Sequence, residues 1–341
     1  MKQLLPFVLL FCATNLGAQT KKVIVLGQTD AIVQRWDNVS AKVDVRRVSE
    51  EEVESEIVDA DAFVGNVTPE WVRLGKKLQW VQTTSAGVEQ VLHKTGTTDL
   101  RDSDIVLTNN QIVQGPEIAD HAMALLLSLT REIPRWRELQ AEEKWQPTPR
   151  DLYELNTKTA LVIGVGGIGT QIAIRAWAHG MTVIGVDPED IPFSPFIERV
   201  VKPDMIDDVL PEADVIFMAA PHTEKSHKMI GPSQFELMKK GAWFIAVSRG
   251  GTYDLDALVK ALDSERLAGA GVDVVDVGGP RGEPLTPGHP LWSFKNAIIT
   301  PHIAGRSDLD RERMLGTVEE NIRRFGEGLP LLNVVDKQKG Y

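Results

Sequence analysis

From Ala160 to Gly169 the chain reads ALVIGVGGIG, an apolar run that passes directly into a glycine-rich turn. Residues Thr170 to Ala178, which follow the turn, have helical character. A GxGxxG motif between a strand and a helix, within an alternating pattern of strands and helices, is typical of the turn that binds a dinucleotide pyrophosphate. The sequence therefore predicts a dinucleotide-binding domain around this stretch.

Each residue of the glycine motif has an expected role. Gly164 would make the tight turn, Gly166 would let the backbone approach the pyrophosphate, and Gly169 would let the helix pack against the strand. Gly167 and Ile168 lie at the helix N-terminus, whose free N–H groups and dipole favour anions. All five are therefore candidate cofactor-binding residues; a strand–helix turn without a ligand is the alternative.

An acidic residue ends the next predicted strand. Thr182 to Val186 form that strand and Asp187 follows it, near the spacing of roughly 20 residues at which an acid contacts the adenosine ribose. A carboxylate there bonds a free 2′-hydroxyl and repels a 2′-phosphate, which favours NAD over NADP as cofactor. NADP stays possible, as does a purely structural acid before Pro188.

Outward from the motif, apolar strands alternate with amphipathic helical stretches, which indicates an α/β fold with parallel sheets. A second series of strands precedes the motif, at residues 23–27, 62–65, 78–82 and 105–108. A helix beginning at Pro116 follows that series, and a Trp- and charge-rich stretch then ends at Pro149. Two doubly wound parallel-sheet domains are expected.

Composition agrees with about two domains at roughly 150 residues each, since the chain has 341 residues, 43% of them hydrophobic. Its 37 Lys and Arg against 48 Asp and Glu give a net charge of -11, which argues against nucleic-acid binding. The seven His residues are scattered, and the closest pair, His222 and His227, falls in a loop. No metal site is expected.

The first 18 residues resemble a secretory signal peptide. Met1-Lys2-Gln3 precede the apolar run from Leu4 to Phe11, and Ala18 is a small residue suited to cleavage. The apolar run is shorter than the roughly 20 residues that span a bilayer, so no membrane span is expected. The leader predicts an exported protein, periplasmic or secreted; a cytoplasmic protein is the alternative if the leader does not function.

Three polar residues follow apolar strands, where ligands of open α/β sheets collect. They are Arg249, Glu283 and His302. Each alone has an ordinary explanation, but together they suit the reduction of a 2-keto acid. Arg249 would bind the carboxylate, His302 would protonate the carbonyl oxygen, and Glu283 would stabilise the imidazolium and raise its pKa if it contacts the ring.

Further short stretches, in order along the chain, resemble the D-isomer-specific 2-hydroxyacid dehydrogenases, especially the glyoxylate and hydroxypyruvate reductase branch. Besides the glycine motif, the matching stretches lie at residues 83–88, 108–109, 118–121, 221–223, 248–250, 283–285, 289–292 and 300–305. The resemblance implies an NAD(P)-dependent oxidoreductase that acts on a small 2-keto or 2-hydroxy acid. It also implies that Arg249, Glu283 and His302 are the catalytic residues.

The same resemblance implies the remaining site residues. Backbone N–H groups around Ala86, Gly87 and Val88 would receive the substrate carboxylate, as in an anion nest. Beyond the glycine motif and Asp187, the implied cofactor contacts are Pro221, Thr223, Val247, Arg249, Asp273 and His302.

The domain organisation also comes from the resemblance. It implies a Rossmann NAD-binding domain at residues 126–305, inserted in a flavodoxin-like substrate domain at 21–125 and 306–335. The helical run from Leu309 to Phe325 would return the chain to the substrate domain, and the cleft would lie between the domains. A homodimer is expected, with Trp136 and Trp145 as candidate interface residues.

One departure from the family concerns the acid partner of His302. Family members usually place the Glu about five residues after the Asp of the preceding strand, whereas Asp273 and Glu283 are ten apart, with an apparent insertion at residues 277–281. Asp276 is the alternative partner. An exported binding protein that retains the dehydrogenase fold without turnover is the competing hypothesis for the whole chain.

Overall fold

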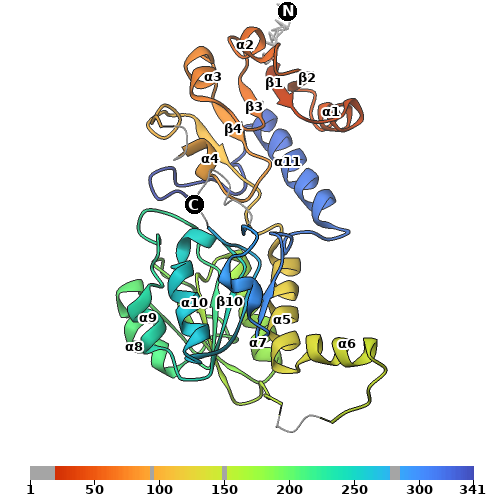
Figure 1. Ribbon diagram of the computed structural model, residues 1–341. Helices are drawn as coiled ribbons and strands as arrows, with labels where there is room; N and C mark the ends of the chain where they lie inside the picture. The colour runs from red at the N-terminus through yellow and green to blue at the C-terminus, as the bar shows by residue number, and fades with distance from the viewer. Residues whose placement is uncertain (1–19, 93–95, 148–151, 277–284) are drawn as a thin grey trace, which may run out of the picture.

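The computed structural model describes residues 20–92, 96–147, 152–276 and 285–341. They form two parallel sheets in separate α/β domains, one above the other in Figure 1. The predicted fold class, two doubly wound parallel-sheet domains, is confirmed. The expected signal peptide (residues 1–18) and Glu283 lie outside the described residues.

The first domain contains a five-stranded parallel sheet in the order β2-β1-β3-β4-β5, which is the flavodoxin-like order. The expected strands did not include β2, an edge strand in which two arginines interrupt the apolar alternation. The elements are β1 (Lys21–Leu26), α1 (Asp30–Asp37), β2 (Val43–Val48), α2 (Val53–Glu56), β3 (Ala62–Val64), α3 (Pro69–Leu74), β4 (Trp80–Gln82), α4 (Glu89–Leu92) and β5 (Val106–Thr108).

The second domain contains a seven-stranded parallel sheet in the order β12-β11-β10-β9-β6-β7-β8. Two helices connect the domains along the chain, α5 (Gly115–Thr130) and α6 (Ile133–Ala141). The second domain's elements are β6 (Thr159–Ile163), α7 (Gly167–Ala178), β7 (Thr182–Val186), β8 (Arg199–Val201), α8 (Ile206–Val209), β9 (Val215–Met218), α9 (Pro232–Leu237), β10 (Ala242–Ala246), α10 (Leu255–Asp263), β11 (Leu267–Val272) and β12 (Ala297–Ile299).

The strand order of the second sheet locates the ligand crevice. The chain runs outward from β6 through β7 to β8, then crosses back to β9 on the other side of β6. In open α/β sheets, ligands bind at the carboxyl ends of the strands where the order reverses. Here that point lies between β6 and β9, directly at the glycine motif.

Helix α11 (Asp310–Glu327) returns the chain to the first domain, beside β1 and β2 in Figure 1. It contributes Val318, Ile322 and Phe325 to the apolar cluster on one face of the first sheet. Helix α5 packs instead with α7 and the second sheet through one continuous apolar face. The expected boundary between residues 125 and 126 falls inside this helix.

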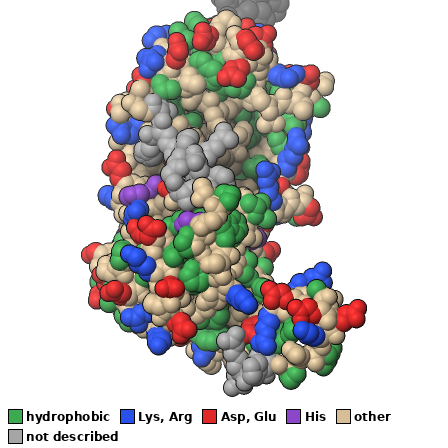
Figure 2. Space-filling view, viewed as in Figure 1, with side chains coloured by type: hydrophobic (Ala, Val, Ile, Leu, Met, Phe, Trp, Pro, Cys, Tyr) green, Lys and Arg blue, Asp and Glu red, His purple; other side chains and the backbone are tan. Residues whose placement is uncertain are grey.

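No helix within the described ranges has both the length and the apolar character needed to cross a bilayer. On the face in Figure 2, acidic and basic side chains are interspersed.

Candidate active site

The second sheet brings most of the predicted site residues to one edge. Its strands are parallel, so their carboxyl ends meet at the same side of the domain. Six strands end next to a predicted residue: Gly164 follows β6, Asp187 follows β7, Pro221 and Thr223 come after β9, Val247 and Arg249 come after β10, Asp273 follows β11, and His302 comes after β12.

The glycine motif has the close contacts that its sequence predicts. Gly164 has φ +90°, and a Cβ there would lie 2.6 Å from the backbone nitrogen of Ala220. A Cβ on Gly169 would overlap the carbonyl oxygen of Gly164, so this helix start can approach its strand only without a side chain. At Gly166 the Cβ direction is open space. Such a turn fits a dinucleotide pyrophosphate at Gly166 and the N-terminus of α7.

Asp187 is held beside the motif. Its carboxylate accepts hydrogen bonds from the backbone N–H groups of Val165 at 2.7 Å and Glu189 at 2.9 Å. The side chain is almost fully buried, so its negative charge has a fixed position at the end of β7. A fixed carboxylate at this strand end fits a ribose with a free 2′-hydroxyl.

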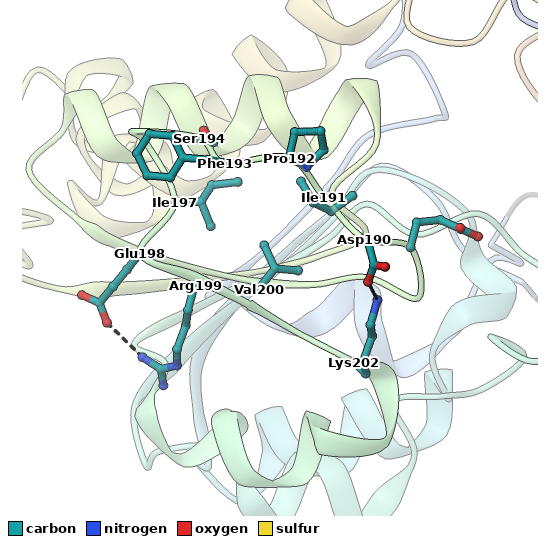
Figure 3. Close-up of a pocket in the computed structure, with 11 residues that line it drawn as sticks. Asp190, Ile191, Pro192, Phe193, Ser194, Ile197, Glu198, Arg199, Val200 and Lys202 are labelled. Atoms are coloured by element: carbon teal, nitrogen blue, oxygen red, sulfur yellow. Dashed lines mark hydrogen bonds and ion pairs between the residues drawn. The ribbon is translucent and has the colours of Figure 1, made fainter.

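A hollow of about 300 Å³ begins just after Asp187, under the loop that crosses from β7 to β8 (Figure 3). Apolar side chains of Ile191, Ile197 and Val200 line it, and the ion pair between Lys202 and Asp190 lies at its edge. Because none of the predicted site residues lines this hollow, we assign it to the crossover connection and not to the active site.

The segment after β9 is a compact turn. Ser226 Oγ donates to the carbonyl of Pro221 at 2.6 Å and accepts from the N–H of Thr223 at 2.8 Å. His222 and His227 lie side by side in the same turn, with Nε2 and Nδ1 3.0 Å apart. Within the described ranges, no three His, Cys, Asp or Glu residues gather as metal ligands would.

The turn between β4 and α4 belongs to the first domain and carries the predicted carboxylate-binding N–H groups. Hydrogen bonds hold three consecutive carbonyls of this turn: Asn110 N–H donates to Ser85 at 3.0 Å, Asn109 Nδ2 donates to Ala86 at 2.6 Å, and Ser85 Oγ donates to Gly87 at 2.7 Å. In a trans peptide the N–H points opposite to the C=O. The N–H groups of residues 86–88 are therefore oriented away from these bonds, as an anion nest requires.

Arg249 reaches this turn from the second domain. Its Nη1 donates to the carbonyl of Ser248 at 2.8 Å, and its Nε donates to Glu89 Oε1 of α4 at 2.8 Å. A Cβ on Gly87 would collide with Arg249 Nη2 and with the Glu89 carboxylate. The structure thus brings Arg249 and the residue 86–88 turn together from different domains.

Asp273 shapes the loop that carries His302. Its carboxylate accepts from Thr300 Oγ1 at 2.6 Å and from the N–H groups of Ile303 and Ala304, both at 2.9 Å. The His302 N–H donates to the Asp273 carbonyl at 2.9 Å, and His302 has φ +55°. The sequence predicts Asp273 as a cofactor contact; in the structure both of its carboxylate oxygens accept hydrogen bonds from this loop.

Burial lowers the pKa of His302, and the positive charge of Arg249 lowers it further, while Asp273 and Glu89 oppose both effects. The sequence predicts a pKa raised by Glu283, which lies outside the described residues. The largest cause of the lowered pKa is the burial of the ring, and the guanidinium that would bind the substrate carboxylate adds to it.

Asp276, the alternative acid partner of His302, lies at a separate hollow. It lines a hollow of about 240 Å³ together with Lys228, Tyr253 and His289. The hydrogen bond with Asp254 is the main cause of the raised pKa of Lys228, and the charge of Asp276 adds a smaller effect.

Sequence reasoning missed two contributions to the site. Glu89 follows the turn as the first residue of a short helix, where an acid is ordinary, so no local pattern marks it. Asn110 follows the matching pair Thr108 and Asn109, and a run of two amides after a strand is a weak signal of a turn-holding role.

Comparison with known proteins adds independent information. A family model described as D-isomer specific 2-hydroxyacid dehydrogenase, NAD binding domain, matches residues 123–304. The chain is 31% identical over 293 residues to a glyoxylate reductase of Korarchaeum cryptofilum, covering 83% of this chain and 84% of that protein. It is 32% identical over 302 residues to a D-3-phosphoglycerate dehydrogenase of Archaeoglobus fulgidus, covering 85% of this chain but only 54% of that one.

Solved structures include a similar protein, an NADPH-dependent glyoxylate/hydroxypyruvate reductase from Sinorhizobium meliloti in complex with NADP and sulfate. The TM-score is 0.78 at 25% identity, and the match covers 94% of this chain and 100% of the other.

Proposed function

This chain belongs to the D-isomer specific 2-hydroxyacid dehydrogenases, and we propose that it reduces a small 2-keto acid, glyoxylate or hydroxypyruvate, to the D-2-hydroxy acid. The observation that carries the proposal is the contact between Arg249 of the second domain and the residue 86–88 turn of the first, with His302 near enough for the Arg249 charge to lower its pKa. The glyoxylate reductase and glyoxylate/hydroxypyruvate reductase among its relatives support the choice of substrate.

Each site residue has a role in the reaction that follows from its charge or its hydrogen-bonding groups. The N–H groups of residues 86–88 and the Arg249 guanidinium bind and orient the substrate carboxylate. NADH, when bound, supplies the hydride that the carbonyl carbon takes up. His302 gives its proton to the carbonyl oxygen and is reprotonated from solvent. The Asp273 carboxylate positions the loop that carries the ring.

For the cofactor we propose NAD in preference to NADP. The glycine motif at residues 164–169 would hold the pyrophosphate, and Asp187 would bind the adenosine ribose, where its fixed charge repels a 2′-phosphate. The Sinorhizobium meliloti relative is NADPH-dependent, so the comparison of both nucleotides belongs in the first assay.

The assay follows NADH and NADPH oxidation at 340 nm with glyoxylate, hydroxypyruvate, pyruvate and phenylpyruvate, with Arg249→Ala as the site variant. We expect turnover of the smaller keto acids with NADH, and loss of about 100-fold or more in kcat/KM in the variant. Glu212→Gln, which breaks an Arg–Glu ion pair with Arg199 away from the site, is the control. Nucleotide binding without turnover of any keto acid would refute the proposed substrate class, and failure to bind either nucleotide would favour the non-catalytic hypothesis.

We also propose a homodimer. Helix α6 extends from the body of the molecule in Figure 1 and has no buried residue, while Ile133 and Trp145 are exposed. Light scattering of the wild type and of Trp145→Ser tests this assembly.

The proposal that residues 1–18 direct export rests on their sequence alone, and a fusion of this segment to a reporter enzyme tests it.

A further inference from the structure

A carboxylate of the protein itself lies at the proposed substrate site. Glu89 begins α4, one residue after the carboxylate-binding turn, and its Oε1 accepts from Arg249 Nε at 2.8 Å. The Glu89 side chain is 23% exposed and that of Arg249 is 31% exposed, so the ion pair is largely shielded from water. It joins α4 of the first domain to the loop after β10 of the second.

The ion pair with Glu89 engages the Arg249 guanidinium, which is the group that would bind the carboxylate of a 2-keto acid. Arg249 Nη2 and the Glu89 carboxylate both lie where a Cβ on Gly87 would stand, so both groups face the turn. A substrate carboxylate held by the turn and by Arg249 would therefore lie next to the Glu89 carboxylate. Two carboxylates sharing one site repel each other, and the repulsion weakens binding of the incoming one.

We propose that Glu89 is a positioning residue that holds Arg249 at the turn in the free enzyme and is displaced from the guanidinium by the substrate carboxylate. The inference rests on the proposed function, because it takes Arg249 as the carboxylate-binding residue. Glu89 thus lowers affinity for monoanionic 2-keto acids while keeping the guanidinium directed at the turn. Removing only its charge should tighten substrate binding.

Glu89 also has an electrostatic effect on His302. Among the described residues, the charged groups that act on the ring are Arg249 after β10, Asp273 after β11 and Glu89 of α4; Nε2 of His121 in α5 lies 3.7 Å from the Asp273 carboxylate. Asp273 is already bonded to the His302 loop. The Glu89 charge therefore helps to keep the His302 proton, and its loss should move the pKa of His302 further down.

The test compares wild type, Glu89→Gln, Glu89→Asp and the control Glu212→Gln. The probe is oxamate, an unreactive analogue of a 2-keto acid, titrated calorimetrically in the presence of NADH. We expect Glu89→Gln to bind oxamate about three- to tenfold more tightly, because an isosteric amide removes the repulsion. Glu89→Asp, which restores the charge, and Glu212→Gln should both resemble wild type. In Glu89→Gln, the upper pH limit of kcat/KM for reduction should shift to lower pH.

Weaker or unchanged oxamate binding in Glu89→Gln would overturn the inference, as would equal tightening in Glu89→Asp. A measurement on the wild type avoids any folding defect of the variants: the Arg249 Nε–H resonance, assigned with Arg249→Lys, should move when oxamate saturates the protein. An unmoved resonance would show that Glu89 stays in place. If oxamate binds as expected but no keto acid is reduced, the proposed function fails while the displacement stands.

Discussion

At the residue scale, the surroundings of His302 disfavour its protonated, positively charged form. Burial of the ring and the positive charge of Arg249 disfavour the imidazolium and lower the pKa of His302 below the usual histidine value. A substrate carboxylate bound to Arg249 would offset the guanidinium charge. Protonation of His302 and binding of the substrate are therefore coupled, which suits a general acid that works only when substrate is present.

The coupling predicts two different pH limits. Reduction needs the protonated ring, so rates should fall as pH rises through the pKa of His302. In kcat/KM, which reports the free enzyme, the fall should begin below the usual histidine pKa; in kcat, which reports the complex, it should begin at higher pH. Steady-state kinetics of NADH oxidation between pH 5 and 9 measure both limits. Coincident limits would show that substrate binding does not change the pKa of His302.

At the scale of elements, the turn between β4 and α4 depends on Gly87. The turn's carbonyls are held by Ser85, Asn109 and Asn110, and the missing side chain of Gly87 leaves the space that Arg249 and Glu89 occupy. A strand end, two amides and a glycine thus combine into the element that we propose binds the substrate carboxylate.

Gly87→Ala tests this element. The methyl group should displace Arg249 from the turn and lower kcat/KM for the keto acid by about 100-fold, while the Kd of NADH stays unchanged. Gly316→Ala is the matched control: Gly316 lies inside α11 with open space around a Cβ. That change should leave activity intact and raise the free energy of unfolding by about 0.5–1 kcal/mol. Kinetics, NADH titration and urea unfolding provide the readouts, and an active Gly87→Ala would contradict the assigned contact.

At the scale of the whole molecule, separate contacts tie the two domains together. One is the Arg249–Glu89 pair, and another is the ion pair between Arg313 of α11 and Glu117 of α5 at 2.8 Å. A third involves residues 334–341: Val334 pairs with Thr108 of the first sheet, and the segment then reaches the loop after Asp187, at the domain junction where Figure 1 marks C.

The far end of this segment contacts Glu189 of the second domain. Lys339 Nζ and the Tyr341 hydroxyl lie 2.6 Å and 3.0 Å from Glu189 Oε1. Burial and the negative charge of Glu189 raise the pKa of Tyr341 to about 12, so its hydroxyl stays protonated and donates to the carboxylate. The segment therefore spans from the first sheet to the neighbourhood of the proposed ribose site.

Lys337 anchors the segment and provides the test. Its Nζ donates to the carbonyls of Leu100, Ser103 and Ile105, at 3.0, 2.5 and 2.8 Å. Lys337→Met should leave these carbonyls without their donor, lower the free energy of unfolding by about 1–3 kcal/mol and speed amide exchange at residues 334–341. Lys42→Met, at a half-exposed ion pair, should change stability by less than about 1 kcal/mol. Urea unfolding and hydrogen exchange check both, and unchanged exchange would show that Lys337 does not anchor the segment.

Much of the fold could be predicted because its signals are local. The strand at residues 182–186 is found where it was expected, and the helix beginning near Pro116 forms α5. Periodicity and glycine spacing report on neighbouring residues, so they needed no knowledge of the rest of the chain. The sequence analysis did not predict strand β2, because Arg46 and Arg47 of this edge strand are exposed and break its apolar pattern.

The sequence by itself determined the dinucleotide turn at residues 164–169, the acid at the end of β7 and the polar residues after the strands of the second sheet. Each depends on backbone geometry within a few residues. Only the tertiary structure decided that Arg249 meets Glu89, that Asp273 is committed to the His302 loop, and that residues 339–341 reach Glu189. These contacts join residues far apart in the chain, since packing two separate sheets against each other creates neighbours that no local pattern contains.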